Sequence, residues 1–248
     1  MLVLRYKWVT WFYGYTAYLL SIHNENLKLD LPIYMKFVDA SRNDGVTLVT
    51  ALAHARYLYR DILGFDGLIA DAAHDHYPIY DLLKNWHIKP FIALSDRYDN
   101  TLQPLGLQLS KNGVPICADG YEMLNWGFDW RKYRIKYRCP LVTGKVKSCP
   151  YSAQCNKSLY GKTVYFRLAS DLRLLTPVPR NSPEWLDTFN DRTASERVNN
   201  RILTDYILES SKRYGKMKIA SFAFLNAINV HLDALIKHVF TPVTSLSA

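Results

Sequence analysis

Apolar and polar positions in the first 95 residues follow strand-like and helix-like periods in turn. Two stretches rich in aromatic and β-branched residues flank the polar turn His23–Asn26, as in a hairpin. Leu48, Leu52 and Ala55 then recur at helical spacing. The predicted elements are strands at 8–22 and 31–38, a helix over about 46–62, a strand at 68–70, a helix over about 79–86 and a strand at 90–94. This order is typical of an α/β fold.

The pattern changes at about residue 96. From there to about 180, short strand-like pieces alternate with Gly, Pro and Asn, which predicts a β-rich insertion. A helix is then expected to begin near Arg192, with a last helix over about 216–238. The buried stripe of the first of these helices is predicted to be Val198, Ile202, Leu203 and Ile207. We therefore expect a core from residues 1–95 and 181–240, an insertion at 96–180 and a tail at 241–248.

Two apolar stretches raise the question of a membrane segment. Trp8–Ile22 follows Arg5 and Lys7 and has no charge, but it is shorter than the roughly 20 residues that a span needs. Its aromatic content favours a strand. Ile219–Ile236 contains Asn, His and Asp, which indicates a packed amphipathic helix. We expect no membrane partner.

Charge and cysteine content narrow the class of protein. The 248 residues carry a formal net charge of +9, which favours a polyanionic partner. Four cysteines without a convincing secretory signal indicate a reducing compartment, the cytoplasm.

Two acidic residues are candidates for chemistry. Asp71 directly follows the apolar run Leu68–Ala70, so it lies at the carboxyl end of a strand, where open α/β sheets place their sites. Alternatively, it is an ordinary turn aspartate. Glu196 is expected in the first turn of the late helix, where the helix dipole alone could explain a carboxylate.

A basic and aromatic stretch, 126–139, lies in the middle of the insertion. Alternation would place its cations on one strand face and its rings on the other. Such a ribbon can follow phosphates with its cations and stack bases on its rings; alternatively, it is an amphipathic strand with a solvated basic face. The candidate DNA-binding residues here are Trp126, Trp130, Arg131, Lys132, Arg134 and Lys136.

All four cysteines also lie in the insertion. Cys149 and Cys155 are too far apart for a paired Cys-x-x-Cys knuckle, which weakens a zinc interpretation. Four thiols in one irregular region could nevertheless close a tetrahedral site, and the alternative is free thiols. The candidate zinc ligands are Cys117, Cys139, Cys149 and Cys155.

An aspartate at a strand end, a distant glutamate and a basic insertion between them suggest two-metal phosphoryl transfer. That chemistry uses carboxylates that converge on two divalent ions about 3.5–4 Å apart. Hard oxygen ligands suit Mg²⁺ or Mn²⁺. Asp71 and Glu196 are the candidate metal ligands.

With these residues the chain resembles the DDE transposases of bacterial insertion sequences, which have a ribonuclease-H-like core. The resemblance covers nearly the whole chain. It implies a mixed sheet flanked by helices with a β-rich insertion, catalytic roles for Asp71 and Glu196, and a nucleoid-associated location. It also implies double-stranded DNA (element ends and target) as partner, with self-association on paired ends. The matching segments are Trp11–Leu20, Leu31–Asp44, Ala70–Asp75 and Arg192–Arg197.

The chain also departs from that family. In the signature Tyr-x2-Arg-x3-Glu-x6-Lys, Arg192 and Glu196 match, but Phe189 and Leu203 replace the tyrosine and the lysine. Arg197 and Arg201 could supply DNA-binding charge nearby, together with Arg192. The family's first aspartate lies on the central strand of the sheet, before the segment that Trp11–Leu20 matches.

No acidic residue precedes Glu25 in this chain, so that first aspartate and strand have no counterpart. We therefore expect the carboxyl-terminal part of a transposase, with little or no catalytic activity. The first alternative is a non-catalytic DNA-binding remnant of a transposase. The second is a structural module held together by zinc at the cysteines.

Overall fold

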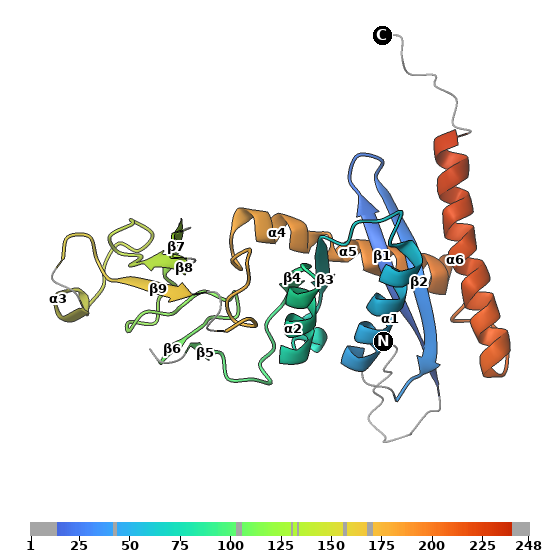
Figure 1. Ribbon diagram of the computed structural model, residues 1–248, viewed down its shortest axis with the longest axis horizontal. Coiled ribbons are helices and arrows are strands. Elements are labelled where there is room, and N and C mark those ends of the chain that lie inside the picture. The colour runs from blue at the N-terminus through green and yellow to red at the C-terminus, as the bar shows by residue number, and fades with distance from the viewer. Residues whose placement is uncertain are drawn as a thin grey trace, which may run out of the picture. The chain divides into compact units, whose positions relative to one another are not determined.

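The protein is a mixed α/β protein, seen in a computed structural model (Figure 1). The structure describes residues 14–41, 44–102, 106–129, 131–132, 134–155, 158–167 and 171–239. The chain divides into two compact units, which we describe separately. Unit 1 consists of residues 1–64 and 191–248, and unit 2 of residues 65–190.

Unit 1 is built on an antiparallel hairpin of β1 (Tyr15–Asn24) and β2 (Leu29–Asp39). The predicted hairpin is confirmed, but its turn lies at 25–28 rather than at 23–26. His23 belongs to β1 and faces its partner Asp30 across the strands, with 2.7 Å between Nδ1 and Oδ1. Lys28 closes the turn with a left-handed backbone, φ 48°.

Three helices pack against this hairpin: α1 (Asp44–Tyr59), α5 (Arg192–Asn200) and α6 (Lys216–Val239). A π-helical segment, η3 (Arg201–Asp205), continues α5. The predicted helices are confirmed, although α1 ends three residues earlier than expected. Ile207 was wrongly placed in the buried stripe, since it follows the helical segment and its side chain is 57% exposed. One hydrophobic cluster of unit 1 consists of Met35, Val198, Ile202, Leu208, Ala223 and Val230, and α1 also buries Leu48, Ala51, Leu52 and Ala55.

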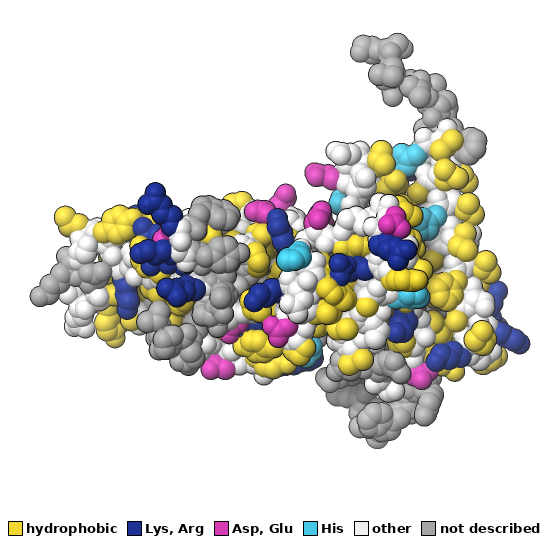
Figure 2. Space-filling model, in the orientation of Figure 1, with side chains coloured by type: hydrophobic (Ala, Val, Ile, Leu, Met, Phe, Trp, Pro, Cys, Tyr) yellow, Lys and Arg dark blue, Asp and Glu magenta, His cyan; other side chains and the backbone are white. Residues whose placement is uncertain are grey.

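Among the described residues, α6 is the one helix long and apolar enough to cross a membrane by length and composition. One of its faces packs into unit 1 through small or polar residues such as Ala223 and Asn226. Asn226 donates hydrogen bonds from Nδ2 to the carbonyls of Ile202 and Tyr206. The rest of the helix exposes apolar side chains, which Figure 2 shows along its length. The packed face agrees with a core helix, but the exposed apolar side chains were not expected.

Unit 2 begins with a parallel pair of strands, β3 (Gly67–Ala70) and β4 (Lys89–Ile92), in which Ala70 faces Ile92. The short 3-10 helix η1 (Ala72–His74) and then α2 (Tyr77–Asn85) connect the two strands, as the sequence predicted. Pro78 lies in the first turn of α2, where its missing N–H costs no hydrogen bond. The helix α4 (Pro183–Asn190) packs on β4, with Trp185 and Phe91 in one cluster.

The rest of unit 2 is β-rich, as predicted for the insertion. It contains a small pair, β5 (Thr101–Leu102) with β6 (Leu107–Gln108), and a four-residue helix, α3 (Ser152–Cys155). Its main sheet is antiparallel: β7 (Leu124–Asp129), β8 (Arg134–Arg138) and β9 (Thr163–Arg167). The stretch 126–139 is thus not a single ribbon, because it turns back between β7 and β8. The core of this part consists of Leu109, Val114, Met123, Ile135, Tyr137, Val164, Phe166, Leu174 and Leu175.

The strands of the described residues form four separate sheets, β1–β2, β3–β4, β5–β6 and β7–β8–β9. Each sheet is either parallel or antiparallel throughout. The α/β class is therefore as predicted, whereas the single mixed sheet is not seen within these residues. The division into units also groups residues 65–95 with the predicted insertion.

Candidate functional site

Asp71 lies in unit 2, at the carboxyl end of the parallel strand β3. It caps η1: its Oδ1 accepts a hydrogen bond from the backbone N–H of Ala73 at 3.1 Å. The same oxygen lies 2.8 Å from Nδ1 of His74. The side chain is nevertheless 58% exposed, so its carboxylate is accessible from solvent. Its position therefore fits both a turn aspartate and a carboxylate that can bind a ligand.

A buried ion pair fixes the turn that carries Asp71. The carboxylate of Asp75 accepts hydrogen bonds from Nε and Nη2 of Arg173, with Nη2 to Oδ2 at 2.6 Å. Both side chains are fully buried. Asp75 also accepts from the N–H of Ser95 at 2.7 Å and from the hydroxyl of Tyr80 at 2.8 Å. Asp75 thereby joins the turn after β3 to the segment after β4.

A second buried arginine, Arg180, extends this network. Its Nε donates to the carbonyl of Ile92 at 3.0 Å and its Nη2 to the hydroxyl of Tyr80 at 2.9 Å. Burial lowers the pKa of Arg180. Burial also disfavours the charge of Arg173, but the hydrogen bond and the charge of Asp75 outweigh this and raise its pKa. One carboxylate and two guanidinium groups thus hold the ends of β3 and β4 in place.

Glu196 lies in unit 1 on α5, a helix that packs against the hairpin. It is the fifth residue of the helix, so the prediction that it lies in the first turn is wrong and the dipole does not account for it. Its Oε1 accepts from Nη1 of Arg192 at 2.5 Å, and its side chain is 58% exposed. The preceding residue, Ser195, lies 2.8 Å from Ser21 of β1, hydroxyl to hydroxyl. The hairpin therefore fixes the face of α5 beside Glu196.

Each of the three arginines predicted to bind DNA near Glu196 pairs with a carboxylate in unit 1. Arg192 pairs with Glu196, Arg197 with Asp30 and Arg201 with Asp233. The hydrogen bond from Arg197 is the largest of the effects that lower the pKa of Asp30. These pairs reduce the positive charge that the three arginines present to a polyanion.

The main sheet of unit 2 carries basic and aromatic side chains on one face, where Arg138 is buried and Arg134 pairs with Asp129 at 3.0 Å. On β8, Arg134 stacks on the ring of Tyr165 at 3.8 Å and Arg138 on that of Tyr160 at 3.6 Å. Lys136 donates from Nζ to the hydroxyl of Tyr160 at 2.9 Å. Figure 2 shows Lys and Arg side chains gathered over this region. We call this the ribbon surface; it consists of Trp126, Arg134, Lys136, Arg138, Tyr160 and Tyr165.

The ribbon surface differs in detail from the prediction. The ring of Tyr137, on the opposite face of β8, is buried in the core and cannot stack on bases. Arg131 and Lys132 are exposed in the turn between β7 and β8. Trp126 is exposed, while Trp130 lies outside the described residues. Of the rings beside the cations, that of Trp126 comes from the alternating stretch, and those of Tyr160 and Tyr165 come from later segments.

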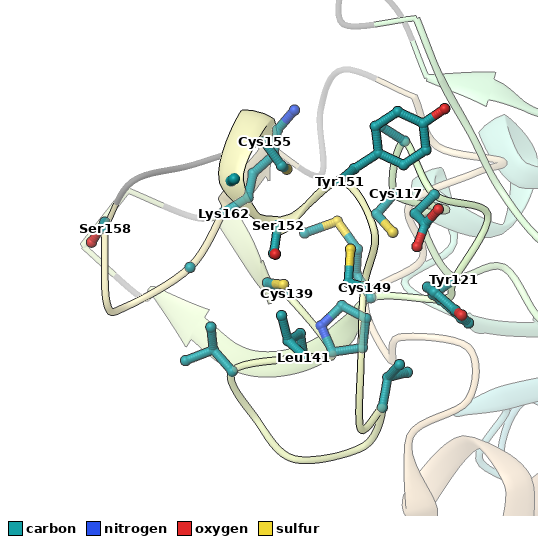
Figure 3. A pocket seen from close by; sticks show the side chains of 18 of the residues that line it. Cys117, Tyr121, Cys139, Leu141, Cys149, Tyr151, Ser152, Cys155, Ser158 and Lys162 are labelled. Carbon is teal, nitrogen blue, oxygen red and sulfur yellow. The ribbon is translucent and has the colours of Figure 1, made fainter.

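A cavity of about 550 Å³ lies in unit 2 beside the connection between β8 and β9 (Figure 3). All four cysteines line it, and all are free. Burial, and then the nearby carboxylate of Asp119, raise the pKa of Cys149. Within the described part of the chain, no three His, Cys, Asp or Glu side chains are arranged to hold a metal ion.

Comparison with protein-family models, with curated proteins and with solved structures finds no match for this chain.

Several residues of these sites could not be found from the sequence. Tyr160 and Tyr165 are more than 20 residues after the basic stretch begins. The register of β8 and β9 brings Tyr165 beside Lys136, and Tyr160 lies in the connection just before β9. Arg173 is 98 residues from Asp75, and no spacing rule joins them. The sequence offered one signal for the buried network: Asp71 and Asp75 lie close together, and the second of them, Asp75, is buried.

Proposed function

We propose that this protein is a DNA-binding protein of the DDE transposase type, with Asp71 and Glu196 as its metal-binding carboxylates. One observation carries the proposal: a hairpin, a helix and a parallel strand pair follow one another, and Asp71 ends the first strand of that pair. A late helix that bears Glu196 packs on the hairpin. This is the order of elements that the resemblance implies.

The pairing of the strands supports the same proposal. In the family's mixed sheet, the strands other than the first form one antiparallel pair and one parallel pair. The pairs β1–β2 and β3–β4 have these two arrangements.

The chemistry of the two carboxylates fits Mg²⁺ or Mn²⁺. Both ions prefer hard oxygen ligands, and both side chains are more than half exposed. When bound, such ions would supply charge stabilisation for phosphoryl transfer. Before Glu196 can bind an ion through Oε1, that oxygen must give up or share its hydrogen bond with Arg192.

The ribbon surface supports DNA as the partner. Rings hold Arg134 and Lys136, so these cations keep their place when a phosphate binds. Before Arg134 can bind a phosphate, it must give up or share its ion pair with Asp129. Arg131 and Lys132 extend the positive charge into the exposed turn. Rings that are part exposed, such as those of Trp126 and Tyr165, can also stack on unpaired bases.

DNA binding is tested by fluorescence anisotropy with a labelled duplex, in EDTA, over a series of salt concentrations. The double variant Arg131→Gln/Lys132→Gln should bind more weakly, and the slope of log K against log salt should fall by about 2, since each lost phosphate contact removes about 0.9. The control is Lys111→Gln, which removes an equally exposed cation elsewhere in unit 2. Equal slopes for both variants would count against the ribbon surface.

Catalysis is tested with the same duplex in Mg²⁺, with strand cleavage measured on denaturing gels. Asp71→Asn and Glu196→Gln should each abolish any cleavage and leave binding in EDTA unchanged; Asp96→Asn, an exposed aspartate in unit 2, is the control. Replacing Mg²⁺ by Fe²⁺ with ascorbate and peroxide should cut the chain next to both carboxylates. Cuts near neither residue would refute their assignment as metal ligands.

The second candidate is a DNA-binding protein that does not cut DNA. It is favoured by the ion pair between Arg192 and Glu196, which already occupies Oε1 of this carboxylate. Salt-dependent binding without Mg²⁺-dependent cleavage, in the two assays above, would select it over the first candidate.

A further inference from the structure

The connection between β8 and β9, residues 139–162, is unusually long for a compact unit. Loops beyond about 12–15 residues without much regular structure are uncommon unless something holds them. The four residues of α3 are its only described helix or strand. No hydrophobic side chain between Tyr137 and Val164 is buried among the described residues apart from Pro140, and Leu159 is 98% exposed. Apolar packing therefore contributes little to holding this connection in place.

The chain's four cysteines all meet at this connection. Cys139, Cys149 and Cys155 belong to it, and Cys117 lies in a separate turn that lines the same cavity. Figure 3 shows their side chains around one space. Cysteines placed at random along 248 residues would not all line one cavity. Their common location indicates a shared role.

Hydrogen-bonded turns hold the backbone of three of these cysteines. The carbonyl of Cys117 accepts from the N–H of Gly120 at 3.0 Å, and that of Cys149 from the N–H of Ser152 at 3.2 Å. Cys139 is tied to the sheet edge, since its N–H donates to the carbonyl of Lys162 at 2.9 Å. A Cβ on Gly161 would lie 2.9 Å from Cβ of Cys139, so glycine is needed there for the two segments to pack.

The wall of the cavity also contains an unsatisfied acceptor. Oδ2 of Asp119 is buried and has no hydrogen-bond partner among the described residues. Asp119 lines the same cavity and lies beside Cys117 and Cys149. A buried carboxylate oxygen without a donor is costly, so this wall of the cavity is not fully satisfied by its own hydrogen bonds.

From these observations we infer that Cys117, Cys139, Cys149 and Cys155 bind one Zn²⁺, which fastens the connection 139–162 to the turn at 117–120. Four thiols lose four protons and their sulfurs bind one Zn²⁺ in a tetrahedron, with no change in oxidation state. Zinc suits this ligand set because thiolates are soft ligands. The closed four-ligand set indicates a structural site rather than a catalytic one.

The site has to close on the metal. The side chains are not yet arranged to hold an ion, so binding must draw the sulfurs together. The connection can follow, because so little of it is packed into the core. The tetrathiolate would carry two negative charges beside the carboxylate of Asp119, and Lys162 in the cavity wall offsets part of this charge.

The test uses the full chain, purified under reducing conditions and dialysed against EDTA, then reloaded with Zn²⁺. Mass spectrometry of the metal should find about one Zn²⁺ per chain. Loading with Co²⁺ should give the thiolate-to-cobalt charge-transfer absorption and the intense visible bands of a tetrahedral site. Cys117→Ser and Cys149→Ser should each weaken Zn²⁺ binding by about two orders of magnitude. The control, Ser152→Ala, changes another side chain of the same cavity and should bind normally.

If a cysteine variant does not fold, the Co²⁺ spectrum of the parent chain decides. Less than about 0.1 Zn²⁺ per chain, or a Co²⁺ spectrum without thiolate bands, would overturn the inference. So would a mass 4 Da below that of the reduced chain after preparation without reductant and with Zn²⁺ present, since that loss indicates two disulfides in place of a metal. None of these measurements depends on DNA binding or cleavage, so the zinc site and the proposed function can fail separately.

Discussion

Removal of the Asp75 carboxylate is expected to destabilise unit 2 more than any exposed substitution. In Asp75→Asn, the charge that Arg173 faces disappears while the guanidinium stays fully buried. One amide NH₂ would also point at a donor, either Arg173 or the N–H of Ser95. Loss of one partner of a buried ion pair costs about 3–5 kcal/mol.

This cost is large beside the total stability of a domain, about 5–15 kcal/mol. With a urea m-value of about 2 kcal/mol per M, a loss of 4 kcal/mol lowers the midpoint of unfolding by about 2 M. Tryptophan fluorescence reports on the right part of the chain, because Trp86, Trp126, Trp130 and Trp185 belong to unit 2. Asp96→Asn is the matched control, since this aspartate is exposed and its Lys111 partner is 3.9 Å away.

A double-mutant cycle sharpens the test. Arg173→Met removes the other charge, so Asp75→Asn/Arg173→Met should be less destabilised than the sum of the single variants, by about 2 kcal/mol. A midpoint for Asp75→Asn within 0.3 M of that for Asp96→Asn, which corresponds to roughly 0.6 kcal/mol, would refute the reasoning. So would a coupling energy near zero.

Two further substitutions follow from local geometry. Gly113→Ala should lower the free energy of unfolding by about 2 kcal/mol or more, because φ of Gly113 is +69° and the new Cβ would lie 2.6 Å from Cδ of buried Arg180. Gly120→Ala is the control: its φ is +80° but its Cβ would meet open space, so it should lower the free energy less. Equal losses of stability in thermal unfolding would contradict this reasoning. Arg197→Gln should lose the stabilisation that comes from the lowered pKa of Asp30. A lowered folded-state pKa stabilises fully above the ordinary value of 3.8, and this stabilisation is lost as pH falls through the lowered value. The difference in stability between variant and parent should therefore be largest near neutral pH and shrink as pH falls below 3.8; a difference that does not shrink would contradict this origin.

Helices and strands could be predicted from the sequence where a single hydrophobic period was clear. The hairpin, α1, the strand before Asp71, α2, β4, α5 and α6 all follow from apolar periodicity. Boundaries were less certain, as at the hairpin turn, where His23 pairs with Asp30 across the strands instead of turning. A turn residue and an edge-strand residue have similar polarity, so the pattern could not separate them.

The contacts in each site between residues far apart in the chain could not be predicted from the sequence. Nothing in the alternation of 126–139 indicated that the chain turns back within it, or that Tyr160 and Tyr165 would cover its cations. Asp71 was found because a strand pattern ends at it, but Asp75 and Arg173 depend on a contact across 98 residues. The four cysteines lie in one irregular region of the sequence, but their spacing does not indicate that they line one cavity.

The division into units has a consequence for the order of folding during synthesis. Unit 2 is one continuous stretch, 65–190, whereas unit 1 needs both the hairpin segment and the helices after residue 190. On the ribosome, all of unit 2 emerges before α5 and α6, so it can fold while the hairpin still lacks the helices that cover it. Residues 65–190 form the loop between the two segments of unit 1. When this loop has folded as unit 2 its ends are restricted, so bringing α5 to β1 costs less entropy. A substitution that breaks the network around Asp75 would then slow the folding of unit 1, although the substituted residue is not part of unit 1.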